Sequence, residues 1–328
     1  MKGRATADRV QGTGSPQERI RRDNLAALLR NVHLQGSVTR SALAERLHVN
    51  RSTILTLSRE LAGAGLIREE SPHGRTPRPG RPSFVVRPGS DVYVLAFDVR
   101  ADACTAAQVR LGGDVLDRRT VPLSPADPDA AAAQIAHAGR LLGMAAAGSG
   151  LCAGVGVAVP GPLERDGPGL LAALGAVRAR EPYRGLPFRV GHDSNLALIA
   201  EHRRGAGVGH RSVLWLQDRD GLRGGVMLDG SPIGGEEGQG VDLGPLVAGS
   251  RARPCLRAAG MERLQSLYAP ELIILGDGLD AWAESPGQPG PRVVRAALGA
   301  DAVLTGAAEL AFAALLADPI GVISRSKK

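Results

Sequence analysis

Short polar side chains and arginines recur on one predicted helical face between residues 50 and 62. Apolar residues at helical spacing, from Ile54 to Leu61, are expected to face a core. Ser52, Thr56 and Arg59 then point the opposite way, because successive helical residues are rotated by about 100°. Hydroxyl and guanidinium groups of this kind contact base edges and phosphates in a DNA major groove. The predicted DNA contacts of this segment are Arg51, Ser52, Thr53, Thr56 and Arg59.

A second arginine-rich segment, residues 73–82, lies at the tip of a predicted hairpin. Residues 66–68 and 83–86 alternate in polarity, as two short paired strands do. Guanidinium groups on an extended chain of Gly and Pro suit a narrow minor groove, where the potential is most negative. The predicted contacts with the minor groove or phosphates are Arg75, Arg78 and Arg81.

The elements that must position these side chains start at polar capping residues. Thr39 is expected to cap a helix over residues 40–47, and Asn50 is expected to cap a second helix that ends near Ala62. Two helices, a turn and a basic hairpin predict a winged helix-turn-helix DNA-binding domain over residues 18–88. Residues 1–17 are polar and contain Gly, so we expect them to be disordered.

The charge of the chain is divided unevenly between its two parts. Residues 1–90 hold 16 Lys or Arg against 7 Asp or Glu, a net charge of +9, whereas residues 91–328 hold 24 against 26, a net charge of −2. Three-helix packing also occurs in domains that bind no DNA, where arginines only solvate a loop. The strongly basic first part favours a nucleic-acid partner over that alternative.

The cysteine content and the apolar runs of the sequence bear on the cellular compartment of the protein. Cys104, Cys152 and Cys255 are widely spaced, so they predict neither a disulfide framework nor a CxxC metal pair, and a reduced cytoplasmic location fits. We also expect no membrane span and no signal peptide, because no apolar run is long enough for a span and the N-terminal residues are polar.

Residues 89–328 alternate between apolar strand-like runs and helical stretches. Runs joined by Gly-Gly-Asp and Asp-Gly turns predict hairpins. Strands and helices in this order favour an α/β domain in two similar lobes. The strands are expected at 92–98, 105–111, 115–121, 155–159, 188–190, 212–217, 224–228 and 272–275, and the helices at 130–147, 196–204 and 302–317.

Five segments in this part, taken in order, resemble the ROK (repressor, open reading frame, kinase) family. They are VGVAVPGPLERDG, HDSN, GGVMLDGSPIGGEEGQ, PELIILGDGL and LGADAVLTGAAELA. The resemblance covers about residues 20–317 and implies the actin-like ATPase fold of sugar kinases. A winged helix that ends in GRP ahead of this domain is similar to the regulator branch of the family. It implies that residues 89–328 form an effector and oligomerisation domain.

The resemblance also implies a set of ligand-binding residues. Asp193 matches the family's catalytic base, and Asn195 and Glu236 match contacts to sugar hydroxyls. Gln239 stands where the family has a zinc-bound His. Two roles remain open, with equal weight, for these four residues. Either they bind a small molecule, or they have a purely structural role; the residues are Asp193, Asn195, Glu236 and Gln239.

Departures from the family pattern led to negative predictions. Arg100 replaces the phosphate-loop glycine in residues 98–102, and the second phosphate segment, 218–225, carries two Asp. These departures predict that the chain is not an enzyme and has no catalytic residues. Of the four zinc ligands only Cys255 is retained, which predicts no metal and no cofactor. Only seven residues separate Glu262 from Pro270, which indicates a shortened C-terminal lobe.

These observations together predict a cytoplasmic DNA-binding transcriptional regulator, with repression as the expected mode. Its expected partners are a double-stranded DNA operator and a possible sugar or pathway-metabolite effector, with no membrane partner. A homodimer or higher homo-oligomer is expected, because two-fold symmetry suits a pseudo-palindromic operator. Two alternatives remain: a sugar kinase fused to a DNA-binding domain, and a DNA binder that needs no ligand.

Overall fold

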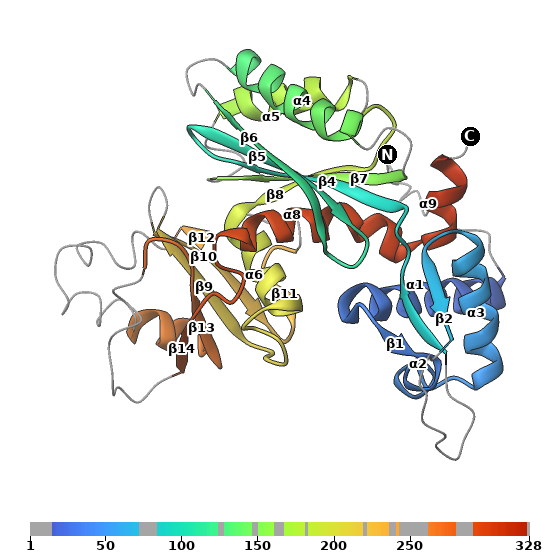
Figure 1. The fold of residues 1–328 in the computed structure, drawn as a ribbon. Coiled ribbons are helices and arrows are strands. Elements are labelled where there is room, and N and C mark those ends of the chain that lie inside the picture. Colours follow the sequence, from blue (N-terminus) through green and yellow to red (C-terminus); the bar gives the residue numbers. More distant parts are fainter. Residues whose placement is uncertain are drawn as a thin grey trace, which may run out of the picture.

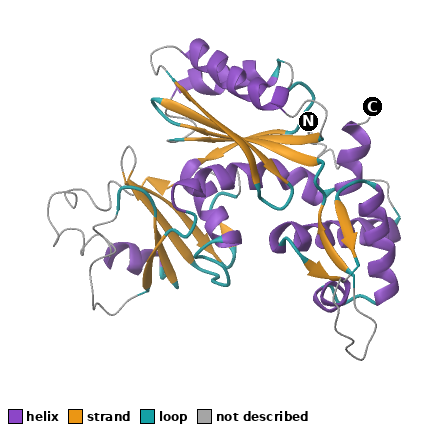
Figure 2. Cartoon of the chain, viewed as in Figure 1, coloured by secondary structure: helices purple, strands orange, loops and turns teal. Residues whose placement is uncertain are grey.

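The chain folds into an N-terminal module and two larger lobes, each lobe built on its own sheet (Figure 1, Figure 2). This arrangement is taken from a computed structural model. The structure describes residues 15–71, 84–123, 128–145, 150–160, 167–180, 183–218, 222–235, 241–242, 262–279 and 291–326.

The described residues of the N-terminal module, 15–71 and 84–88, form three helices and a small sheet in the order β1-β3-β2, with β3 antiparallel to both neighbours. Two helix starts confirm the predicted caps. Thr39 Oγ1 accepts a hydrogen bond from the Ala42 amide at 3.2 Å, and Asn50 Oδ1 accepts one from the Thr53 amide at 2.7 Å. The elements are α1 (Pro16–Gln35), β1 (Val38–Thr39), α2 (Arg40–Arg46), α3 (Arg51–Gly63), β2 (Ile67–Glu70) and β3 (Val85–Pro88).

Helix α1 begins earlier than the sequence prediction allowed. Disorder was predicted up to residue 17, but the helix starts at Pro16 and its start is held by a capping box. The Ser15 amide donates to Glu18 Oε2 at 2.8 Å, and the Glu18 amide donates to Ser15 Oγ at 3.2 Å. The prediction was therefore wrong at residues 15–17, and residues 1–14 lie outside the described part of the chain.

The first lobe is a five-stranded sheet with helices on both faces (Figure 1). Side chains of its central strand alternate: Val94 and Ala96 join the cluster that includes α8, whereas Leu95 and Phe97 join the cluster that includes α4 and α5. The strands run in the order β6-β5-β4-β7-β8. They are β4 (Val92–Val99), β5 (Ala103–Arg110), β6 (Val115–Pro122), β7 (Leu151–Val159) and β8 (Phe188–His192), and the helices are α4 (Pro128–Ala145), α5 (Gly167–Arg178) and α8 (Ala302–Ala317).

The second lobe repeats the connectivity of the first. In each sheet a strand has an antiparallel neighbour on one side and two successive parallel strands on the other, β5-β4-β7-β8 in one lobe and β10-β9-β13-β14 in the other. This repeat confirms the prediction of two similar lobes. Further elements are α6 (Asp193–Arg204), β9 (Val213–Asp218), β10 (Leu222–Leu228), β11 (Ser231–Pro232), β12 (Val241–Asp242), β13 (Leu272–Leu275), β14 (Arg292–Arg295), η3 (Gly299–Asp301) and α9 (Pro319–Ser326), and residues 262–268 are also helical.

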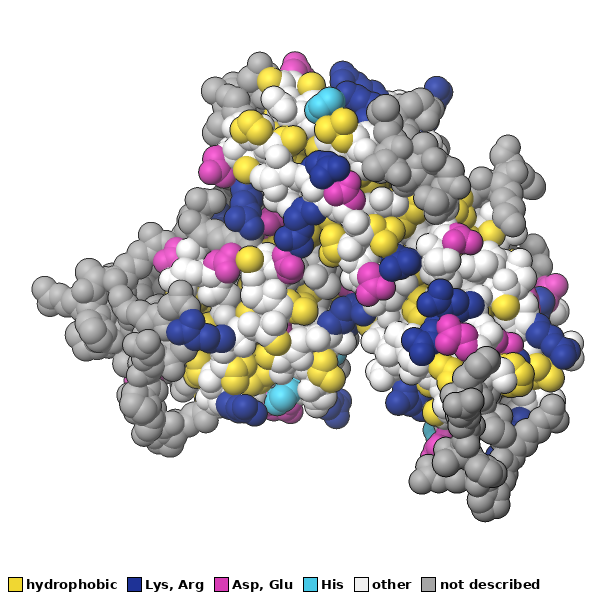
Figure 3. All heavy atoms as spheres, viewed as in Figure 1, with side chains coloured by type: hydrophobic (Ala, Val, Ile, Leu, Met, Phe, Trp, Pro, Cys, Tyr) yellow, Lys and Arg dark blue, Asp and Glu magenta, His cyan; other side chains and the backbone are white. Residues whose placement is uncertain are grey.

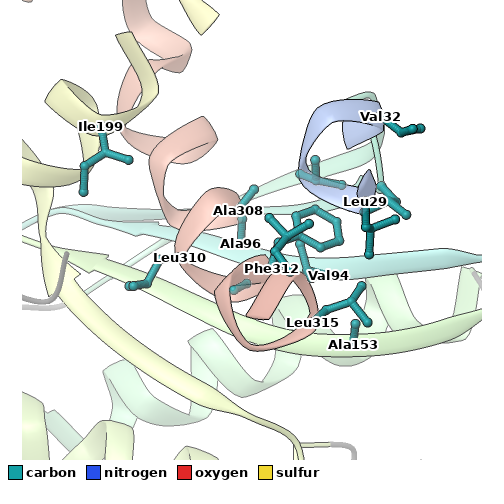
Figure 4. Close-up of a cluster of buried hydrophobic side chains, with 14 of the residues drawn as sticks. Leu29, Val32, Val94, Ala96, Ala153, Ile199, Ala308, Leu310, Phe312 and Leu315 are labelled. Atoms are coloured by element: carbon teal, nitrogen blue, oxygen red, sulfur yellow. The ribbon is translucent and has the colours of Figure 1, made fainter. Parts of the chain in front are cut away.

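Helix α8 joins the module to the first lobe through a shared apolar core. Leu29 and Val32 of α1 belong to the same buried cluster as Phe312 and Leu315 of α8 and Val94 of β4 (Figure 4). Among the described residues, the stretch Gly299–Ala317 alone is long and apolar enough to cross a bilayer, with mean hydropathy 1.6, but 67% of that window is buried in the molecule. Core packing therefore accounts for its apolar composition.

Candidate nucleic-acid interface and ligand site

The face of α3 predicted to contact DNA is exposed in the structure. Ser52, Thr56 and Arg59 lie on the surface, as does Arg51, and Thr53 is half-buried. The opposite face, which includes Ile54, Leu57 and Leu61, is buried. The periodicity in the sequence thus separates the two faces of this helix correctly.

The hydroxyl groups on this face are already engaged with the start of their own helix. Ser52 Oγ and Thr53 Oγ1 both donate to Asn50 Oδ1, at 2.7 and 2.8 Å, and Thr56 Oγ1 donates to the Ser52 carbonyl at 3.1 Å. Because each hydroxyl proton is used, the oxygens present acceptor lone pairs to the solvent. The guanidinium groups of Arg51 and Arg59 are hydrogen-bond donors that this face presents to a nucleic acid.

A groove of about 460 Å³ runs between α3 and the first half of α1, a contribution that the sequence reasoning missed. Arg21 of α1 donates to Glu60 Oε2 of α3 at 2.8 Å, which ties the two helices together beside the groove. Ile20 is 62% exposed there. The groove is lined by Gln17, Ile20, Arg21, Asn24, Ser52, Thr53, Thr56 and Leu57.

Ion pairs join two strands of the small sheet to each other and join the sheet to α2. Arg40 at the start of α2 pairs with Glu69 of β2, and its guanidinium carbon lies 4.5 Å from the ring centroid of Phe84. Arg87 of β3 pairs with Glu70 of β2 at 2.9 Å. The space-filling view accordingly shows basic side chains beside acidic ones on the module (Figure 3). The predicted contacts Arg75, Arg78 and Arg81 lie outside the described residues.

The candidate ligand site lies at one edge of the first sheet. Asp98, Ala158 and Gly191 are in register across the parallel strands β4, β7 and β8, and α6 begins two residues beyond Gly191 at Asp193. The carboxyl ends of parallel strands are where open α/β sheets place their ligands. The strand register thus brings the segment at 98–102 and the HDSN turn to the same edge.

Asp193 is the centre of a buried hydrogen-bond network at that edge. It is 4% exposed, and its Oδ1 accepts from the Ser194 amide at 2.6 Å and from Ser194 Oγ at 3.2 Å. Its Oδ2 accepts from Gln217 Nε2 at 2.8 Å, and His192 Nδ1 lies 3.0 Å from Oδ1. Gln217 also donates to Ser194 Oγ at 3.1 Å. The network therefore ties α6 to β9 of the second lobe.

The other predicted ligand contacts are only partly described. Asn195 is 1% exposed, and its amide nitrogen donates to the Ile233 carbonyl at 3.5 Å. Glu236 and Gln239 lie outside the described residues, as does Cys255. The structure therefore brings Asp193 and Asn195 together at the start of α6 and adds Gln217, Ser194 and His192, which sequence reasoning missed.

The described residues of the two segments compared with phosphate loops make contacts within their own turns or with a neighbouring turn. Arg100 Nε and Nη2 both donate to Asp98 Oδ2, at 3.1 and 3.0 Å, so the arginine folds back on its own turn. The Asp218 amide donates to the Asp277 carbonyl at 2.9 Å. Gly278 has φ +81°, and a Cβ there would lie 2.2 Å from the Asp218 carbonyl oxygen, so the close approach of these turns requires glycine.

A second buried polar cluster lies at the opposite end of α6. Glu309 of α8 is 2% exposed and accepts from Arg204 Nε at 2.7 Å and from Arg203 Nη1 at 3.3 Å. His33 of α1 is fully buried, with Nε2 3.1 Å from Glu309 Oε1 and 2.7 Å from Arg204 Nη2. Burial opposes ionisation of Glu309, but His33, Arg204 and Arg203 outweigh it and hold the pKa of this carboxyl well below its usual range.

Sequence comparisons with known proteins give one partial match. No known protein-family profile matches the chain. A glucokinase from Halalkalibacterium halodurans is 27% identical over 177 residues, which are 51% of this chain and 53% of the relative. The chain thus matches about half the length of that curated relative.

Solved structures match over more of the chain. A ROK family transcriptional regulator, described as a homologue of the E. coli MLC protein, is 18% identical with a TM-score of 0.67 and covers 93% of this chain and 99% of its own. An inorganic polyphosphate/ATP-glucomannokinase from Arthrobacter sp. strain KM is 24% identical with a TM-score of 0.53 and covers 67% of this chain and 98% of its own. The chain has the same fold as this ROK transcriptional regulator and this glucomannokinase, which supports the resemblance to the ROK family.

The same comparisons correct one prediction. The departures in the phosphate segments led us to expect that the chain is not an enzyme, but sugar kinases recur among the similar proteins, the glucokinase and the glucomannokinase included. Motif departures in two turns were therefore insufficient ground for excluding catalysis. Regulator and kinase both remain as function classes for a chain of this fold.

Proposed function

We propose that the chain is a DNA-binding transcriptional regulator in which α2 and α3 form a helix-turn-helix and the β2–β3 hairpin is its wing. The observation that carries this proposal is the exposed polar face of α3 on a part of the chain with net charge +9. Phosphate attraction and base contacts then come from the same surface. The contacting residues are Arg51, Ser52, Thr53, Thr56 and Arg59, with Arg75, Arg78 and Arg81 on the wing.

The proposed domain division follows from this assignment. Residues 18–88 bind the operator, and residues 89–328 form the effector and oligomerisation domain of a cytoplasmic repressor. The ROK transcriptional regulator supports the assignment because it covers 93% of this chain, whereas the glucomannokinase covers 67%. A homodimer would present two copies of α3 to a pseudo-palindromic site.

A small-molecule effector, such as a sugar or another metabolite, is proposed to bind at the start of α6. Asp193 and Asn195 are both buried there, and Asp193 Oδ2 is bonded to Gln217 of the second lobe. A ligand hydroxyl that replaced Gln217 at this carboxylate would change the bond between the two lobes. Glu236 and Gln239 complete the proposed ligand set.

The DNA contact is tested by Arg59→Ala. A sequence that binds the wild type is first selected from a random duplex library, and its Kd is then compared with that of random DNA. Loss of a base-contacting arginine should weaken specific binding by about 10- to 100-fold and relax selectivity at one position. Arg184→Ala, an exposed arginine of the first lobe, is the matched control. An unchanged Kd for Arg59→Ala, or the absence of any selected sequence, would contradict the proposal.

Phosphoryl transfer to a sugar hydroxyl is the second candidate function. The observation that favours it is the placement of the Asp193 carboxylate at the edge shared by β4, β7 and β8, where a general base for a hydroxyl would stand. A coupled assay of ATP consumption with glucose tests it. Turnover that requires sugar and disappears in Asp193→Asn would establish the activity, and turnover unaffected by the substitution would exclude this role for Asp193.

A further inference from the structure

Helix α6 carries a polar cluster at each end, and the two clusters belong to different parts of the molecule. Its first residue, Asp193, holds Gln217 of the second lobe. Its last residues, Arg203 and Arg204, hold Glu309 of α8, which in turn contacts His33 of α1. The helix has 12 residues and so spans roughly 16–18 Å between these ends.

The distal cluster, His33, Arg203, Arg204 and Glu309, joins the N-terminal module to both the sheet and α6. The Gly112 amide, in the turn between β5 and β6, donates to His33 Nδ1 at 3.0 Å. Arg204 Nη1 donates to the Gly112 carbonyl at 2.9 Å, and Arg204 Nη2 donates to the His33 carbonyl at 3.3 Å. One arginine of α6 therefore bonds to α1, to the sheet and to α8 at once.

Helix α6 is buried and closely packed along most of its length. Its residues Asp193–Glu201 are all buried, so the helix has little room to bend without moving its neighbours. It crosses α8 at Gly306, where an added Cβ would lie 2.0 Å from the Leu196 carbonyl oxygen. Glu201 accepts from the Leu298 amide and from the Ala206 amide, both at 2.7 Å, which fixes the last turn.

We infer that α6 couples the candidate ligand site to the DNA-binding module, with Arg204, Glu309 and His33 as the positioning residues that set the orientation of α1. The inference rests on the proposed function, because orientation of α1 matters only if the module binds DNA. A shift of α6 driven from Asp193 moves Arg204. Since Arg204 is bonded to both the side chain of Glu309 and the main chain of His33, α1 must follow or lose these bonds.

The first test is a double-mutant cycle on DNA binding, with Asp193→Asn at one end of α6 and Glu309→Gln at the other. The Kd of the selected duplex is measured for the wild type, both single variants and the double variant. Independent sites this far apart should combine within about twofold. The inference predicts a departure from additivity of at least fivefold, and additivity within twofold would overturn it.

A control cycle separates coupling from general destabilisation. Asp301→Asn makes the same acid-to-amide change on an exposed carboxylate, which pairs with Arg118 of β6 at 2.8 Å. Combined with Asp193→Asn, it should be additive. If Glu309→Gln fails to fold, Arg203→Gln replaces it, since Arg203 is 27% exposed and reaches Glu309 at 3.3 Å.

The second test needs neither a ligand nor DNA. Hydrogen exchange of α1 amides near His33 is compared between the wild type, Asp193→Asn and Asp301→Asn. The inference predicts that Asp193→Asn speeds exchange in this part of α1 and that Asp301→Asn does not. Unchanged exchange in Asp193→Asn would overturn the coupling. A wild-type protein that selects no DNA sequence would instead refute the proposed function while leaving this measurement valid.

Discussion

The two ends of α6 bury polar groups in different ways. At its start the Asp193 carboxylate is met by an amide N–H, a hydroxyl, the Gln217 amide and the His192 ring, none of which carries the fixed charge of a guanidinium group. At its end the Glu309 carboxylate is met by two guanidinium groups and an imidazole. A carboxylate held by donors of this kind can exchange one of them for a ligand. Removal of a partner from a carboxylate surrounded by charged groups costs far more free energy of folding. The first end of α6 therefore suits ligand binding, and the second end suits holding α1 in place.

Glu309→Ala should cause the largest loss in the free energy of unfolding. A small loss would contradict the contrast between the two ends of α6. Removal of this carboxylate leaves Arg203 and Arg204 without their buried partner, and such losses cost about 3–5 kcal/mol. Urea unfolding measures the change in the free energy of unfolding. Asp301→Ala, which removes an exposed partner of Arg118, should cost less than about 1 kcal/mol. Equal costs would mean that burial does not distinguish the two pairs.

Acid should remove much of the same stabilisation. Because the pKa of Glu309 is lowered on folding, its ionisation stabilises the fold above the ordinary value of 4.5 and loses this effect as the pH falls below it. The difference in unfolding free energy between the wild type and Glu309→Gln should therefore be constant near neutral pH and shrink below about pH 4.5. Titration of that difference from pH 7 to pH 3, with Glu45→Gln as an exposed control, checks the sign.

Gly306→Ala tests the crossing point that links the two ends. The added methyl group would overlap the Leu196 carbonyl oxygen of α6, and overpacking of this kind costs about 1–3 kcal/mol. Gly175→Ala is the matched control, because Gly175 of α5 has no atom within 4 Å of the added Cβ and alanine favours a helix. Thermal unfolding should show a lower Tm for the first variant and an equal or higher Tm for the second.

Asp193→Asn should have the smallest effect on stability, about 1 kcal/mol. The amide oxygen can keep the bonds from Ser194, and Gln217 can turn its own oxygen toward the new amide nitrogen. Loss of a negative charge at the start of α6 removes a small favourable interaction with the helix dipole. Urea unfolding compares this variant with Glu309→Ala, and a cost above that of Glu309→Ala would reverse the contrast drawn here.

Local signals in the sequence were enough to predict where α2 and α3 begin. Thr39 and Asn50 act within three residues of themselves, so the starts of α2 and α3 could be predicted from capping chemistry. The capping box of Ser15 and Glu18 is equally local, and its pattern was present in the sequence but overlooked. Strands and helices with apolar periodicity were also found, whereas α5 lies in a stretch where the comparison with family motifs gave no match.

Contacts between distant residues could not be derived in the same way. His33 and Glu309 are 276 residues apart in the sequence. The sequence around either residue contains no pattern that identifies the other as its contact partner. The sequence did hold one signal, an acidic residue inside the apolar stretch AVLTGAAELAFAALLA, which requires a buried partner. The prediction of function failed for a different reason. It rested on departures from a phosphate-binding motif in the turns at 98–102 and 218–225, and such departures alone do not decide whether a protein of this fold catalyses a reaction.

The shared core of α1 and α8 also sets an order of events during synthesis. Leu29 and Val32 leave the ribosome long before Phe312 and Leu315, the side chains against which they pack. At the usual rates of translation, the 276 residues between His33 and Glu309 take roughly fifteen to sixty seconds to make. Throughout that interval α1 exposes an apolar stripe and lacks the carboxylate that its histidine contacts. The nascent protein therefore acquires an oriented DNA-binding module only after α8 has emerged.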